Sequence, residues 1–215
     1  PMKNRLSAIS RWKIFDNLRR SVVEIFQLAM LVVGWALLPD LALQWSGLVL
    51  LVIAFPWLFS LGISLIRPPR DQSWLAYYMA VGRDAITNFQ QFGLGVVFLP
   101  HQAVVSADGI IRTLYRLWIS GRNLLEWQTA SQVERALGVG SQLETWRKMW
   151  PVTAFCLVLG MLIGLHVTVG SGATSNDRFV FVMATLPLVL VWLASPSMAF
   201  ALSSPAILGE IHLTE

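Results

Sequence analysis

The chain has 215 residues and a net charge of +4, and 55% of its residues are hydrophobic while only 13% are charged. Soluble globular domains carry about a quarter charged residues, so this composition, with a mean hydropathy of +0.61, excludes an ordinary soluble globule. The Lys and Arg residues cluster around the apolar runs, as the residues that orient membrane spans do, and no nucleic-acid partner is expected.

The opening segment, residues 1–21, mixes basic and aromatic residues and ends immediately before an apolar run. It lacks the apolar core of a cleavable signal peptide, so we expect a cytoplasmic juxtamembrane segment. Pro1 is not a translational start. Either Met2 is the initiator or, as we expect, the chain is a piece of a longer polypeptide.

The first pair of predicted spans covers residues 22–38 and 45–66, each about the length that crosses a bilayer. The turn between them is short and has no basic residue, which predicts a hairpin over residues 22–66. Glu24 interrupts the first span. Because Arg20 lies four residues earlier on the same helical face, we expect an Arg20–Glu24 ion pair at the membrane edge.

The middle segment, residues 67–149, is predicted to be cytoplasmic and amphipathic. Polar residues break residues 74–98 too often for a span. Beyond Pro100 the pattern predicts a helix over residues 101–119, ended by Gly121, with Asp108, Arg112 and Arg116 stacked on one face and apolar residues on the other. Such a helix lies in the headgroup layer.

The basic residues of this helix have two interpretations. The favoured one is anchoring to anionic lipid. The other is a platform for a cytoplasmic catalytic domain or for an anionic, nucleotide-bearing substrate, because arginine binds phosphate with two parallel hydrogen bonds.

The second pair of predicted spans covers residues 150–169 and 179–200, followed by a tail over residues 201–215. We therefore predict an all-α integral membrane fold, with four transmembrane helices in two hairpins (22–66 and 150–200) and amphipathic interfacial helices between them. By the distribution of Lys and Arg, both ends and the middle segment are expected in the cytoplasm.

The motifs of self-sufficient active sites are missing from this sequence. Cys156 is the one cysteine, which excludes an internal disulfide, and its apolar surroundings predict a small packed side chain. The three histidines do not have the spacing of metal ligands, so no metal is expected. With no phosphate-binding glycine loop, nucleophile elbow or D-x-D pair, we predict no catalytic residue and no cofactor within this stretch.

Five motifs carry a resemblance to one family: "RWKIFDNLRRS" (11–21), "LPHQA" (99–103), "DGIIRTLYRLWIS" (108–120), "LLEWQTASQVE" (124–134) and "SPSMAFALSSPA" (195–206). On these motifs the chain resembles the membrane region of the cyclic β-1,2-glucan synthases. The resemblance implies a part of a processive glucosyltransferase of the bacterial inner membrane that uses UDP-glucose and a divalent cation, Mg or Mn.

The resemblance also implies where the chemistry is found. In that family the catalytic aspartates and a Q-x-x-R-W acceptor motif lie N-terminal to this region, and a phosphorylase-like domain lies C-terminal to it. The implied partners are the lipid bilayer, these two domains of the same polypeptide, UDP-glucose and the glucan. "AISRW" (8–12) has Ala8 where the acceptor motif needs Gln, so it is not assigned that role.

The function hypothesis is therefore a membrane module that seats a catalytic domain on the bilayer. The residues expected at this seat are charged or aromatic: Arg11, Trp12, Asp16, Asn17, Arg19, Arg20, Asp108, Arg112, Arg116, Glu126 and Trp127. Glu126 is expected to pair with Arg122 one helical turn earlier. The alternative is a non-enzymatic membrane scaffold or a transporter subunit. A transporter should carry charges at mid-span, and the four predicted spans have none there.

Overall fold

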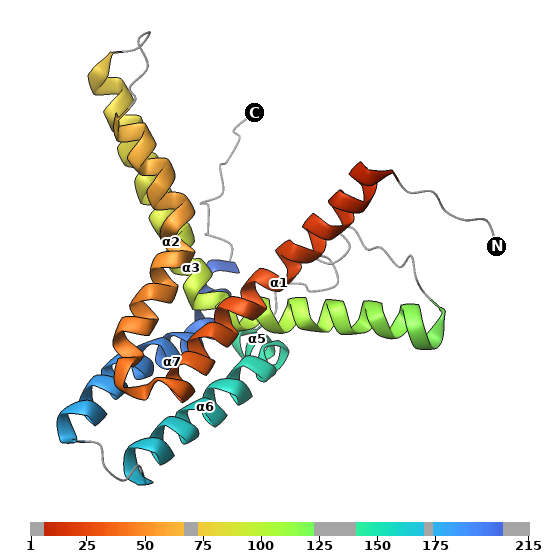
Figure 1. The fold of residues 1–215 in the computed structure, drawn as a ribbon, viewed down its shortest axis with the longest axis vertical. Coiled ribbons are helices and arrows are strands. Elements are labelled where there is room, and N and C mark those ends of the chain that lie inside the picture. Colours follow the sequence, from red (N-terminus) through yellow and green to blue (C-terminus); the bar gives the residue numbers. More distant parts are fainter. Residues whose placement is uncertain (1–6, 67–72, 123–140, 170–173, 204–215) are drawn as a thin grey trace, which may run out of the picture.

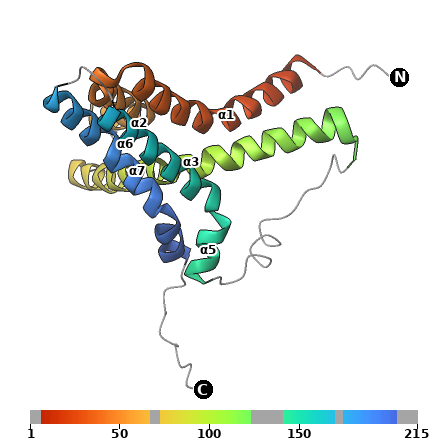
Figure 2. The same cartoon turned by 90° about the horizontal axis from the view of Figure 1, so that it is seen from below.

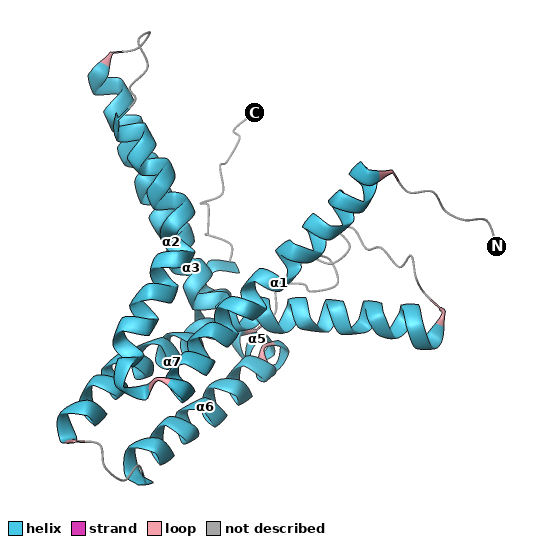
Figure 3. Ribbon diagram, viewed as in Figure 1, coloured by secondary structure: helices cyan, strands magenta, loops and turns pink. Residues whose placement is uncertain are grey.

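The computed structural model describes residues 7–66, 73–122, 141–169 and 174–203, and all regular structure in these ranges is helical, with no strand (Figures 1 and 3). The elements in chain order are α1 (Ala8–Leu37), the 3-10 turn η1 (Pro39–Leu41), α2 (Ala42–Ile66), α3 (Trp74–Tyr115), the π-helical turn η2 (Arg116–Ser120), α5 (Gln142–Lys148), α6 (Trp150–Val169) and α7 (Ser175–Ser203). The predicted all-α class is confirmed for this part of the chain.

The described ranges contain five helices long and apolar enough to cross a membrane, one more than predicted. The additional candidate is the stretch formed by α3 and η2 (Trp74–Ser120). The count of four spans is therefore not confirmed. The predicted break at Pro100 is wrong, because Pro100 lies inside the continuous helix α3 instead of starting a new one.

Two of the polar side chains in the first half of α3 donate hydrogen bonds to the backbone of the same helix. Thr87 Oγ1 donates to the carbonyl oxygen of Arg83 at 3.1 Å, and Asn88 Nδ2 donates to that of Asp84 at 2.7 Å. Such internal bonds reduce the cost of placing polar groups in an apolar environment. The sequence interpretation counted these residues as breaks in the apolar run and so predicted no span over residues 74–98.

Local signals set several helix ends. Ser7, Ser73 and Ser141 cap the N-termini of α1, α3 and α5, and each serine hydroxyl accepts a bond from the backbone N–H three residues later. Gly121 ends η2 with φ at +60°, a conformation that favours glycine. The predicted stop at Gly121 is confirmed.

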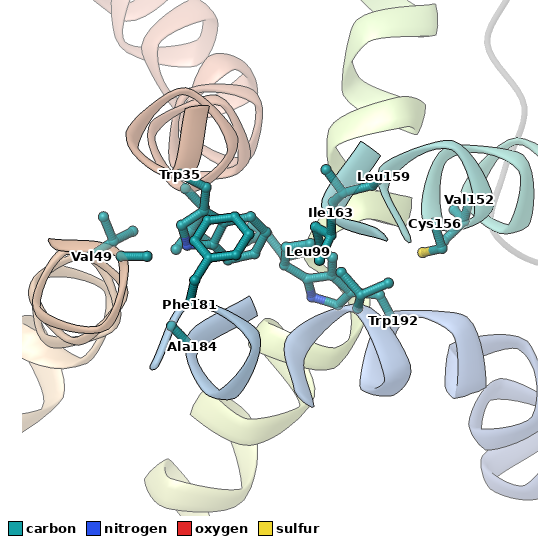
Figure 4. Packing of buried hydrophobic residues seen from close by; sticks show 13 residues of the cluster. Trp35, Val49, Leu99, Val152, Cys156, Leu159, Ile163, Phe181, Ala184 and Trp192 are labelled. Carbon is teal, nitrogen blue, oxygen red and sulfur yellow. The ribbon is translucent and has the colours of Figure 1, made fainter. Parts of the chain in front are cut away.

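The core lies where α1, α2, α3, α6 and α7 meet (Figure 4). Trp192 of α7 is completely buried, with its ring centroid 6.0 Å from that of Trp35 of α1 and 6.4 Å from that of Phe155 of α6. The Trp35 indole donates to the Ser46 hydroxyl at 2.7 Å, which satisfies both groups inside the bundle. Cys156 is buried in the same cluster, as predicted.

The first hairpin depends on a close approach between α1 and α2. The Trp45 indole crosses Gly34 and donates to the carbonyl oxygen of Met30 at 2.7 Å. A Cβ at position 34 would collide with this indole ring. Glycine is therefore required where the two helices turn.

Two pairs of helix segments extend away from the bundle as arms (Figure 1). The second half of α2 lies beside the first half of α3, and the two halves of α3 run in different directions in Figure 1. The other pair consists of the first half of α1 and the second half of α3. At the opposite end of the bundle, η1 lies near the start of α7 in both views.

Candidate functional site

The first half of α1 carries a compact set of ion pairs on its surface. The Asp16 carboxylate accepts from the guanidinium groups of Arg19 and Arg20, at 2.9 Å and 2.8 Å. The predicted Arg20–Glu24 pair is wrong, because Arg20 bonds to Asp16. An acidic residue four positions before a basic one interacts better on a helix than one four positions after it, which explains why Arg20 pairs with Asp16 and not with Glu24.

The second half of α3 carries a similar acid–base pair on its surface. Arg112 Nε donates to the Asp108 carboxylate at 2.8 Å, and both side chains are exposed. Arg116 follows one turn later as the first residue of η2. The predicted stacking of Asp108 and Arg112 on one helix face is confirmed.

A cleft brings these two segments together. Its volume is about 410 Å³, and we name it the α1–α3 cleft after its lining residues: Asn17, Leu18, Ser21, Ser106, Gly109, Ile110, Thr113 and Leu114. Residues about 90 positions apart in the sequence thus share one concave surface. Of the predicted seat residues, Asn17 lines this cleft itself, and the others of α1 and α3 belong to the same two helix segments.

Arg11 and Trp12 lie nearer the N-terminus of α1, where they line a shallow surface hollow with Ala8 and Phe15. The ring centroids of Trp12 and Phe15 are 5.9 Å apart, and Trp12 is 66% exposed. An exposed aromatic pair beside an arginine is suited to the membrane interface or to a partner surface.

Two predicted seat residues, Glu126 and Trp127, lie outside the described residues, and so does the predicted contact between Glu126 and Arg122. The structure therefore places nine of the eleven predicted positions, all on α1, α3 or η2. The seat role of these residues stays a prediction.

A hydrogen bond between α3 and α7 holds the bend of α3 against the bundle. Pro100 has no N–H, so the carbonyl of Val96 loses its partner in the helix. The Trp192 indole N–H donates to this carbonyl oxygen at 2.9 Å. The proline-freed acceptor is thereby satisfied from a neighbouring helix, as membrane helices require.

A smaller polar pocket lies between α2 and α3 in the other arm. Its volume is about 160 Å³, and its lining includes Trp57, Ser60, Asp84 and Asn88. A water molecule takes about 30 Å³, so several waters fit beside these groups. The pocket explains how Asp84 and Asn88 fit against the otherwise apolar helix α2.

The sequence interpretation did not single out Ser21, Ser106, Gly109 and Thr113. On α3 the small residues recur at intervals of three and four, which is the spacing of one helix face where another helix approaches closely. This spacing was present in the sequence, but the interpretation followed the neighbouring charged residues Asp108, Arg112 and Arg116 instead. Within the described ranges, no three His, Cys, Asp or Glu side chains gather closely enough to hold a metal ion.

A scan against protein-family models found no match. The chain is similar, however, to the cyclic beta-(1,2)-glucan synthase NdvB of Rhizobium meliloti (strain 1021), with 37% identity over 206 residues. The match covers 95% of this chain but only 7% of the relative's length. The resemblance to a cyclic glucan synthase drawn from the motifs is therefore confirmed, for one segment of such a protein, and the apolar helices fit a membrane region.

Proposed function

We propose that this chain is the membrane module of a processive inner-membrane glucosyltransferase that makes cyclic β-1,2-glucan from UDP-glucose, and that it seats the catalytic domain on the bilayer. The observation that carries the proposal is the 37% identity over 95% of the chain to a cyclic glucan synthase. Five apolar helices support a multi-pass membrane location.

The basic segments of α1 and α3 support the seating role. Arg19, Arg20 and Arg112 are more than half exposed while they are held by Asp16 and Asp108. Ion pairs of this kind fix the side chains in place and leave guanidinium surface open for a carboxylate or phosphate partner.

On this proposal both ends of the chain and the outer ends of both arms lie on the cytoplasmic side, where UDP-glucose is found. Four of the five candidate helices then cross the membrane, and α3 does not. The glycosyltransferase and phosphorylase-like domains flank this region in the same polypeptide. The divalent cation, Mg²⁺ or Mn²⁺, binds in the catalytic domain and not to this chain.

The test is the double variant Arg112→Glu and Arg116→Glu in the synthase that contains these residues. We expect cyclic glucan formation from UDP-glucose to be abolished, while membrane fractionation still finds the protein in the membrane. The matched control, Arg112→Lys and Arg116→Lys, keeps the charge and should retain most of the product. Normal glucan output from the charge-reversed variant would refute the seating role.

A further inference from the structure

The α1–α3 cleft has the lining of an amphiphile site. We propose that it binds one anionic phospholipid, with the headgroup at the outer end of the cleft and an acyl chain along its apolar side. The cleft shares Asn17 with the predicted seat, and the cation Arg116 belongs to both, but lipid binding at this site does not depend on glucan synthesis.

The lining divides into two kinds of surface. Hydroxyl and amide groups come from Asn17, Ser21 and Thr113, and apolar surface comes from Leu18, Ile110 and Leu114. Volumes of about 300–1,000 Å³ are typical of small-molecule sites, and the cleft holds about 410 Å³. Because Leu18 is 52% exposed and Leu114 38% exposed, the apolar side of the cleft continues onto the outer surface, where an acyl chain can lie.

The charges at the two ends of the cleft differ. Lys13 lies four residues before Asn17, and Arg116 lies three residues after Thr113, so each is one helical turn beyond the lining on its own helix. The N-terminal end of α1 and the C-terminal end of α3 lie on the same side of the molecule in both views (Figures 1 and 2), so both cations are at the outer end.

The acidic side chains near the cleft also favour a lipid headgroup at its outer end. Asp108 bonds to Arg112 and Asp16 bonds to two arginines, so these carboxylates are already paired. Glu24 is half-buried and lies three residues beyond Ser21, at the inner end. A phosphate is therefore attracted to the outer end and repelled from the inner one. A zwitterionic headgroup would gain less from this arrangement.

A larger side chain at position 109 should fill the cleft without disturbing helix α3. Gly109 lines the cleft, and a Cβ added there meets no atom within 4 Å. Gly109→Leu therefore places its side chain in the open space, and leucine favours a helix more than glycine does. Gly82→Leu is the matched control, because Gly82 lies on the same helix, also has open space at its Cβ, and lines no part of the cleft.

The experiment measures binding of phosphatidylglycerol to the full chain in detergent by native mass spectrometry, with phosphatidylcholine as the comparison lipid. We expect Gly109→Leu to weaken phosphatidylglycerol binding about tenfold, which is about 1.4 kcal/mol, and Gly82→Leu to leave it unchanged. Lys13→Gln with Arg116→Gln should remove the preference for phosphatidylglycerol over phosphatidylcholine.

Three results would overturn the proposal. The first is equal binding by Gly109→Leu and the unmodified chain, and the second is equal affinity of the unmodified chain for the two lipids. The third is displacement of the lipid by inorganic phosphate alone, which would assign the cleft to free phosphate. Far-ultraviolet circular dichroism of every variant verifies that the helices are intact, so that a loss of binding is not a loss of fold.

Discussion

The hydrogen bond between Trp192 and the Val96 carbonyl exists because Pro100 removes the normal helical donor. This dependence predicts energetic coupling between positions 100 and 192. In the unmodified chain, Trp192→Phe leaves the Val96 carbonyl without its indole partner. In a Pro100→Ala background the restored backbone N–H bonds to that carbonyl, so the same substitution leaves nothing unpaired.

The expected coupling is about 1 kcal/mol. A buried acceptor left without a partner costs about 1–3 kcal/mol, whereas measured hydrogen bonds between helices in membrane proteins average about 0.6 kcal/mol and reach about 1.7 kcal/mol. Trp192→Phe also weakens the packing on Trp35 and Phe155. That loss occurs in both backgrounds, so it cancels in a double-mutant cycle.

The assay is reversible unfolding of the full chain in mixed micelles, followed by circular dichroism, for the four members of the cycle. Trp45→Phe is the control, because it removes an indole–carbonyl bond, to Met30, that lies away from Pro100. We expect the control to cost the same with and without the Pro100→Ala substitution. If Trp192→Phe also costs the same in both backgrounds, the argument that the proline creates this acceptor is refuted.

Two further predictions concern packing and topology. Gly34→Leu drives a side chain into the Trp45 indole and should destabilise the chain by about 1–3 kcal/mol. Gly47→Leu is the control, because its Cβ has open space, and it should not destabilise the chain. Thermal unfolding compares the two variants, and equal melting temperatures would contradict the close approach of α1 and α2. Arg83→Cys and Arg116→Cys place cysteines on either side of the α3 bend, in the two arms that the proposal puts on the cytoplasmic side. Both should react with a membrane-impermeant thiol reagent applied from that side, and the buried Cys156 does not compete for it. Labelling from opposite sides would show that α3 crosses the membrane.

The hairpin helices were accessible to sequence reasoning because long apolar runs leave few alternatives. The predicted bounds 150–169 are those of α6, and the predicted second span ends with α2 at residue 66. Gly121 was predictable as a stop for a similarly local reason. These features depend only on neighbours along the chain.

The middle of the chain was harder to predict because tertiary contacts decide its form. Residues 85–107 contain no Lys, Arg, Asp or Glu, and at about 1.5 Å per residue they reach about 34 Å as a helix, enough to cross a hydrocarbon core of about 30 Å. The sequence alone also did not reveal that Val96 would find a donor on α7, 96 residues away. Without that donor, Pro100 predicts a helix start.

The candidate site was predicted in its residues but not in its shape. The charged residues of α1 and α3 were identified separately, and the pairing of Arg20 with Asp16 instead of Glu24 depends on side-chain direction along the helix. The cleft between the two helices depends on how far apart they lie, which small residues such as Gly109 permit. Spacing in the sequence does not determine that distance.

The bend of α3 links the stability of the bundle to the position of the arms. Leu99, Pro100 and Ala103 are buried at the bend, while the charged residues of α3 lie on the halves that leave the bundle. The Trp192–Val96 bond contributes little to the total stability, but it fixes α7 to the point from which both halves of α3 extend. Loss of this bond should therefore change the orientation of the arms, while the unfolding free energy falls only slightly. If the chain has the seating role proposed above, Trp192→Phe should lower glucan formation by the synthase that contains it while most of the protein stays folded.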